Sequence, residues 1–311
     1  MWTAAGDRPS FLLVTGVSTG ALTAPFAFLG PAWDDALRSV YTDITIRDVA
    51  ERRSILAAVT NDAMADTRPL SRTIARHLDA RMLEALAAGY REGRLLMVAT
   101  TNLDAQRPVI WNIGAIAASG HPGALDLLRR LLLASAAIPG AFPPVMIDVV
   151  VEGAMHQEMH VDGGAVAQAF LYPAALGAGR REELRAGRRV TRVNAYVIRN
   201  GRLAAEGTPV HRRTYRIAAQ AISTMLTASG VNDVTRMYLN TQRDGIAFHL
   251  AYIGEGFRHP YTEPFDPGYM RALYDYAYGL ARNGYPWARR PPWEEIEVPS
   301  AHRDIMRPVP R

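Results

Sequence analysis

The chain has 311 residues, of which 49% are hydrophobic and 21% are charged, and it contains no cysteine. These proportions are typical of a globular protein with a substantial core, and the lack of cysteine excludes disulfides, thiolate catalysis and cysteine-bound metals. The formal charge is +5, and all 35 basic residues are arginines that are scattered along the chain, which argues against nucleic-acid binding.

The sequence also bears on the relation of the chain to membranes. It contains no run of 18 apolar residues, and it does not start with a basic segment followed by an apolar signal core. We therefore expect a cytoplasmic or membrane-peripheral protein, unless a signal segment precedes these residues. Because arginine grips phosphate through two parallel hydrogen bonds, peripheral contact with an anionic membrane is a further expectation.

Predicted strands and helices alternate along the chain. Strands are predicted at residues 11–14, 95–101, 108–113, 145–151, 156–161, 190–198 and 246–253, and helices at residues 21–29, 125–136, 213–241 and 267–282. Glu152-Gly153 predicts the turn of a hairpin. This order predicts an α/β fold with helices on both faces of a sheet. We expect one domain over residues 1–284 and an irregular tail, rich in proline and arginine, over residues 285–311.

The pentapeptide Gly16-Val17-Ser18-Thr19-Gly20 lies between the first predicted strand and helix. In a G-x-S-x-G turn the chain reverses so sharply that the serine is strained and exposed, and both glycines are expected to prevent collisions. The start of the helix places N–H groups and a positive dipole end beside the serine oxygen. Ser18 is therefore a candidate nucleophile, and the backbone N–H of Thr19 is a candidate oxyanion donor.

Apolar residues just past this turn have two interpretations, core or lipid groove. They are Phe26, Phe28, Leu29 and Trp33. Because a helix that packs on a sheet must bury one face, we interpret these side chains as core.

No histidine is placed as an obvious base for Ser18. His211, His249, His259 and His302 are formally available, but the segment before Gly16 is too short to hold the strands that precede the elbow of a Ser-His-Asp α/β-hydrolase. His156 and His160 have the spacing of a metal pair on a helix. Their segment is predicted to be a strand, so we expect no metal site there.

A second candidate lies at His160-Val161-Asp162-Gly163-Gly164, where a predicted strand ends in an aspartate followed by two glycines. The glycines let the backbone turn at once and leave the carboxylate at the sheet edge. Alone, Asp-Gly indicates no more than a turn. Here it follows a segment of small residues and prolines, from Ala134 to Pro144. The serine turn at residues 16–20, which we call the elbow, lies far upstream.

In this order, the elbow, the small-residue and proline segment and the Asp-Gly-Gly motif resemble the patatin-like phospholipases, lipid acyl hydrolases with a Ser-Asp dyad. The resemblance covers residues 2–176, including a similar hairpin at residues 100–111, and residues 265–270 are similar to the end of bacterial members. It implies a three-layer α/β/α fold with a central mixed sheet, a patatin-like hydrolase domain over residues 1–284, and an acyl lipid or phospholipid substrate. It further implies Ser18 as nucleophile, Asp162 as base, Gly16, Gly20, Gly163 and Gly164 as motif glycines, and no metal or cofactor.

One element of the family pattern has no counterpart. Patatin-like proteins carry a first strand and a glycine-rich oxyanion loop before the elbow, and residues 1–9 contain no such glycine run. We therefore expect the first strand to be missing and these 311 residues to hydrolyse esters weakly or not at all. Three interpretations stay open: a serine esterase or phospholipase, a catalytically impaired lipid-binding relative, and an acyltransferase with a histidine base.

Overall fold

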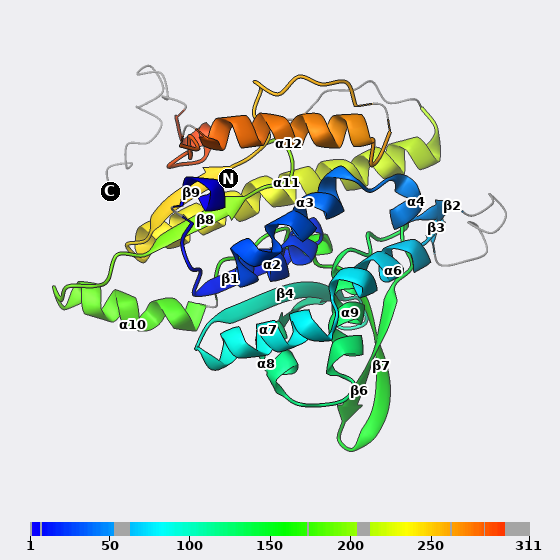
Figure 1. Cartoon of the computed structure of the whole chain (residues 1–311), viewed down its shortest axis with the longest axis horizontal. Helices are drawn as coiled ribbons and strands as arrows, with labels where there is room; N and C mark the ends of the chain where they lie inside the picture. The colour runs from blue at the N-terminus through cyan, green and yellow to red at the C-terminus, as the bar shows by residue number, and fades with distance from the viewer. Residues whose placement is uncertain are drawn as a thin grey trace, which may run out of the picture.

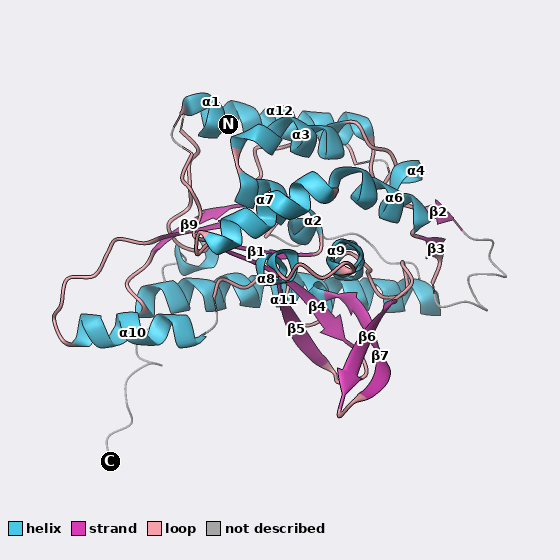
Figure 2. Ribbon diagram, turned by 60° about the horizontal axis from the view of Figure 1, so that its bottom comes forward, coloured by secondary structure: helices cyan, strands magenta, loops and turns pink. Residues whose placement is uncertain are grey.

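The computed structural model describes residues 2–6, 8–52, 63–172, 174–203, 212–261, 263–282 and 284–295. The predicted α/β fold is confirmed, with a central mixed sheet and helices around it (Figures 1 and 2). Across these residues, no helix has both the length and the apolar character required to span a bilayer. The boundary at Tyr285 stays a prediction, and most of the predicted tail, residues 296–311, lies outside the described residues.

The elements follow one another in three stretches of the chain. The first stretch contains α1 (Trp2–Ala5), β1 (Leu13–Val17), α2 (Thr19–Leu29), η1 (Pro31–Trp33), α3 (Asp34–Thr42), α4 (Ile46–Val49), β2 (Glu51–Arg52), β3 (Ala65–Asp66), α6 (Arg68–His77) and α7 (Ala80–Arg91). The second contains β4 (Leu95–Asn102), β5 (Arg107–Asn112), α8 (Ile113–Ala118), α9 (Ala124–Ser135), β6 (Val145–Val151), β7 (Ala154–Asp162) and η2 (Gly163–Ala165). The third contains α10 (Ala174–Arg185), β8 (Asn194–Ile198), α11 (Thr214–Arg243), β9 (Ala247–Ala251), α12 (Pro267–Arg282) and η3 (Pro292–Glu295).

Strand β4 organises the central sheet. β1 pairs with it in parallel, up to Val17 opposite Ala99, and β7 pairs with it antiparallel, starting from Asp162 opposite Thr100. β5 pairs with β4 over both of these stretches. Because β5 occupies one edge of β4, β1 and β7 must share the other edge, and their carboxyl ends meet against two neighbouring residues of β4.

The β6–β7 hairpin follows from its turn chemistry. Glu152 and Gly153 both have positive φ, 51° and 83°, which is the backbone that a two-residue hairpin turn of type I′ requires. The turn fixes the register from Val151 opposite Ala154 to Val145 opposite His160. Asp162, at the end of β7, is thereby carried into the middle of the sheet beside β4.

Two apolar cores hold these elements. The larger lies among α2, α6, α7, α9 and the sheet, and it buries Phe26 and Phe28 as predicted, with Leu86, Leu96 and Leu128. Burial of a side chain of this size stabilises the fold by about 1.5–3 kcal/mol. The smaller core joins α11 to the parallel pair β8–β9, through residues such as Met237 and Phe248.

The largest differences between observed and predicted strand boundaries occur at β1 and β8. β1 starts two residues later than predicted and continues to Val17, next to the serine. Residues 190–193, predicted as strand, precede β8 as irregular chain, because its partner β9 begins only at Ala247, opposite Asn194. Nearby, Trp2 stacks on Trp287, with ring centroids 5.3 Å apart, and so joins α1 to the start of the predicted tail.

Candidate active site

Ser18 occupies the turn between β1 and α2 in a strained backbone conformation, with φ 55° and ψ −124°. A side chain at Gly16 would be impossible without movement, because its Cβ would lie 2.4 Å from the carbonyl oxygen of Gly20. At Gly20, in contrast, a Cβ would meet no atom within 4 Å. The prediction that both glycines prevent collisions is therefore right for Gly16 and wrong for Gly20, which lies at the open start of α2.

Asp162 lies directly beside Ser18. Asp162 is 5% exposed, and its carboxyl accepts a hydrogen bond from the backbone N–H of Gly164 at 2.7 Å. Burial raises the pKa of this carboxyl above its ordinary value, and its interactions with the Ser18 hydroxyl and the Gly164 N–H oppose the shift only in part. Gly163 is required because a Cβ there would lie 2.6 Å from the carbonyl oxygen of Ala99.

The end of α9 and the residues just after it hold both Ser18 and Asp162, the first through a buried hydroxyl that was not predicted from the sequence. Ser135 Oγ accepts the N–H of Ser18 at 3.0 Å and donates to the carbonyl oxygen of Ala99 at 2.7 Å. Two residues later, the carbonyl oxygen of Ala137 accepts the N–H of Asp162 at 2.9 Å. The segment from Ala134 to Pro144 was noted in the sequence for its small residues and prolines. The one feature that could have pointed to Ser135 is that it carries a hydroxyl among small apolar residues.

Replacing Ser135 by alanine is expected to loosen the strained turn. The change leaves the buried N–H of Ser18 and the carbonyl oxygen of Ala99 without this partner, which costs about 1–3 kcal/mol in the free energy of unfolding. Denaturant titration measures this loss. Ser39→Ala is a matched control, since the Ser39 hydroxyl donates within its own helix, to Ala36. Equal stability of the two variants would show that Ser135 does not brace the turn.

Where a described histidine makes a hydrogen bond, its partner is a group other than Ser18. His160 is fully buried, with Nδ1 2.9 Å from the hydroxyl of Thr100 and Nε2 3.1 Å from a carboxylate oxygen of Glu158. His249 bonds to Arg289. His211 and His302 lie outside the described residues. No group of three His, Asp or Glu side chains that could hold a metal occurs in the described part of the chain.

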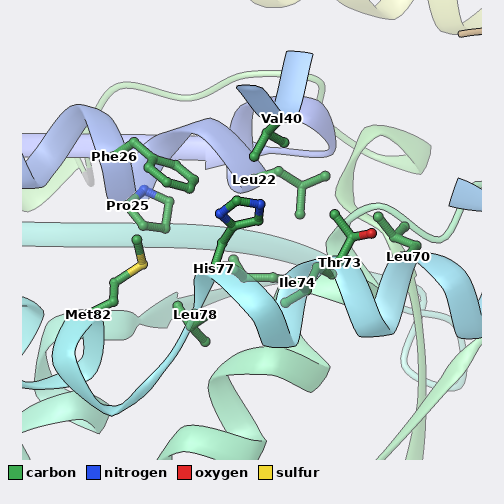
Figure 3. A pocket seen from close by; sticks show the side chains of 11 residues that line it. Leu22, Pro25, Phe26, Val40, Leu70, Thr73, Ile74, His77, Leu78 and Met82 are labelled. Atoms are coloured by element: carbon green, nitrogen blue, oxygen red, sulfur yellow. The ribbon is translucent and has the colours of Figure 1, made fainter. Parts of the chain in front are cut away.

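Two hollows of the described structure lie away from the dyad, and neither is a pocket for an acyl chain beside Ser18. A cavity of about 40 Å³ lies between α2 and α6, where Leu22, Phe26 and His77 face one another (Figure 3). Ligand pockets typically enclose roughly 300–1,000 Å³, so this cavity is too small for an acyl chain. Burial and the nearby Arg76 lower the pKa of His77, which favours its neutral form in this apolar setting.

The larger hollow, of about 370 Å³, is lined by Arg181, Leu184, Arg185 and Arg243, and it does not include the dyad. Arg181 and Arg243 both bond to the fully buried carboxylate of Asp244, at 3.0 and 2.8 Å. These bonds hold the pKa of Asp244 far below its usual range. The two arginines therefore have a structural ion-pairing role at the end of α11.

Comparison with known proteins adds to this geometry. The family model described as patatin-like phospholipase matches residues 3–175, more than half of the chain, including Ser18, Ser135 and Asp162. A search of curated proteins finds no significant match. The central mixed sheet with helices around it agrees with the α/β/α fold expected for the family, and the family indicates an enzyme of the lipid acyl hydrolase class. The chain belongs to the patatin-like phospholipase family.

Proposed function

We propose that this protein hydrolyses carboxylic esters of acyl lipids through Ser18 as nucleophile and Asp162 as general base. The observation that supports this proposal is the interaction of the Ser18 hydroxyl with the buried carboxylate of Asp162, at the point where β1 and β7 meet on β4. A serine hydroxyl becomes a useful nucleophile only when a base within hydrogen-bond reach takes its proton. The partner of the hydroxyl is Asp162, which favours the dyad over a histidine base.

The burial of Asp162 suits it to this role. An exposed aspartate is a weak base, whereas desolvation raises the pKa of Asp162 and with it the proton affinity of the carboxylate. In the first step Ser18 Oγ bonds to the ester carbon while its proton passes to Asp162, which then gives that proton to the departing alcohol. In the second step water loses a proton to Asp162 and attacks the acyl-serine, and Ser18 recovers the proton as the fatty acid leaves.

The negative oxygen of the tetrahedral intermediate needs hydrogen-bond donors. The first N–H groups of an α-helix have no acceptor within the helix, and α2 begins at Thr19, directly after the nucleophile. We assign the N–H of Thr19 as one donor, with the positive end of the α2 dipole behind it. The N–H of Ser18 already donates to Ser135 Oγ, so we do not assign it as an oxyanion donor.

The proposed substrates are phospholipids or other acyl lipids, which the protein would meet by peripheral contact with an anionic membrane. Release of fatty acid from phospholipid vesicles and of p-nitrophenol from short-chain esters tests the activity, with Ser18→Ala as the control for each. Weak hydrolysis that depends on Ser18 is the expected result. Esterase activity that is unchanged in Ser18→Ala would contradict the proposal.

The raised pKa of Asp162 predicts a pH dependence. The base is active only as carboxylate, and burial shifts its protonation to higher pH. As pH falls, kcat/KM for a short-chain ester should therefore decline with a midpoint above about 3.9, the ordinary aspartate value. A stopped assay over a pH series measures this midpoint, with protein stability followed at each pH. A rate limited by a group that titrates at the ordinary value would contradict the assignment of Asp162.

A further inference from the structure

Helix α11 runs along much of the molecule, and its first turns lie at the end occupied by α4, β2 and β3 (Figures 1 and 2). Between Arg216 and Met225, every residue whose side chain is described is exposed. The second half of the helix is different, since Val234 and Met237 are buried in the core that it shares with β8 and β9. The first half of α11 is thus a helix that the described fold leaves uncovered.

The exposed half has one apolar side, which we call the α11 stripe. The stripe consists of Ile217, Ala218, Ala221, Ile222 and Met225. At 3.6 residues per turn these five positions span about 140° of the helix circumference. The larger residues of the stripe are exposed: Ile217 and Ile222 by 53% each, and Met225 by 68%. Polar residues, such as Gln220 and Ser223, lie on the other side.

The stripe does not face the protein core. In the second half of α11 the buried residues are Asp233, Val234, Met237 and Thr241. At 3.6 residues per turn, the centre of their side lies about 140° from the centre of the stripe. The stripe therefore points away from the core side of α11, and packing against the described residues does not account for it. Clustered exposed apolar side chains of this kind mark interaction surfaces.

Helix α11, just after the stripe, contacts the chain that carries the candidate base. Gln168, just after the turn that follows Asp162, bonds through its side chain to the carbonyl oxygen of Leu226 and through its N–H to Asp233, each at 2.6 Å. This anchors the turn on α11 immediately after Met225, the last residue of the stripe. In the same turn, Val166 is 43% exposed.

Exposed apolar side chains continue on the other side of the dyad. Ile138 is 41% exposed and follows Ala137, whose carbonyl oxygen accepts the N–H of Asp162. Met64 is 60% exposed, and its N–H donates to Gly140 in the same loop. The segments that hold the candidate base therefore carry exposed apolar groups of their own.

The start of α11 is positively charged, which indicates a negatively charged partner for the stripe. Arg212, Arg213 and Arg216 lie at the start of α11, and no acidic residue occurs between them and Asp233. A helix with an apolar side and arginines on its polar side is suited to lie at a lipid–water boundary, with the apolar side in the acyl region and the polar side toward the anionic headgroups.

We propose that the α11 stripe docks the protein on an anionic lipid surface, with the Ser18–Asp162 dyad beside that surface. The proposal deepens the proposed function, because it rests on an acyl lipid as substrate and assigns the surface that delivers it. It commits to a lipid surface as the occupant of the stripe, and association with a second copy of the chain becomes an outcome of the test.

The test measures binding to vesicles of phosphatidylcholine with phosphatidylglycerol, and to vesicles of phosphatidylcholine alone. Proteins carrying Ser18→Ala are used so that the lipid stays intact. Ile222→Glu, on the stripe, is compared with Ser223→Glu, which adds the same charge to the polar side of the same helix. We expect Ile222→Glu to weaken binding about tenfold or more and Ser223→Glu about twofold or less, and we expect binding to fall with salt and without the anionic lipid.

Equal binding by the two glutamate variants, or no vesicle binding by the parent protein, would overturn the proposal. A parent that is dimeric without lipid and becomes monomeric with Ile222→Glu, as measured by light scattering, would assign the stripe to a second copy instead. Hydrolysis of a soluble short-chain ester, measured with Ser18 intact, separates this inference from the proposed function. Vesicle binding through the stripe without Ser18-dependent hydrolysis contradicts only the function, and the reverse result contradicts only the docking surface.

Discussion

Ser18→Ala and Asp162→Asn are each expected to abolish the weak hydrolysis of short-chain p-nitrophenyl esters and leave the uncatalysed background rate, since groups that act as one unit lose nearly all activity when either is removed. Both substitutions keep the size of the side chain nearly constant. We therefore expect the far-ultraviolet circular dichroism and the cooperative unfolding transition to be retained.

The matched control is Asp148→Asn on β6, where the carboxylate bonds to Gln157 and Arg130 at the surface. It should leave the rate within about twofold of the parent, as expected of a surface substitution away from the site. If Asp162→Asn keeps most of the activity while a histidine variant loses it, the base is a histidine and the dyad is wrong.

The two glycines of the elbow are expected to respond very differently to alanine. At Gly16 the new Cβ would meet the carbonyl oxygen of Gly20 at 2.4 Å and the Cα of Ala21 at 2.7 Å, both of them backbone atoms that cannot rotate away. Gly16→Ala should therefore lower the free energy of unfolding by about 1–3 kcal/mol or more and displace Ser18 from Asp162, with loss of activity. Gly20→Ala meets open space in a helix and should be neutral or stabilising by up to about 1 kcal/mol.

Urea unfolding of the two variants measures this difference directly. The pattern G-x-S-x-G is symmetrical about the serine, so the sequence alone does not separate its glycines. Similar losses of stability in both variants would show that the tight approach at Gly16 does not define the elbow.

Local patterns predicted much of the fold. The β6–β7 hairpin follows from alternating residues on both sides of Glu152-Gly153, and the strand–serine–helix order follows from an apolar run before Gly16. Such features depend on neighbours in the sequence, and the positive φ values of the turn are a property of its own residues. The long helix over residues 213–241 was likewise predicted, and α11 lies at Thr214–Arg243.

Features that depend on distant residues could not be predicted in the same way. That Ser18 and Asp162 meet depends on the placement of β1 and β7 against Ala99 and Thr100, and no local pattern specifies this register. Only the family resemblance indicated the pair. The hydroxyl of Ser135 reaches a partner more than a hundred positions away in the sequence, and the direction of the α11 stripe depends on which side of the helix the core occupies.

Covalent labelling by a fluorophosphonate probe, followed by mass spectrometry of the peptides, tests the central claim most directly, because the probe reacts only with a serine whose proton is taken by a base. If Ser18 and Asp162 form a dyad, the probe forms an adduct on Ser18 in the unchanged chain and none in Ser18→Ala. In Asp162→Asn the adduct should form at a rate at least about tenfold lower. An unlabelled Ser18 in the folded protein, or labelling at the same rate with and without the Asp162 carboxylate, would contradict the claim that these two residues form a catalytic dyad.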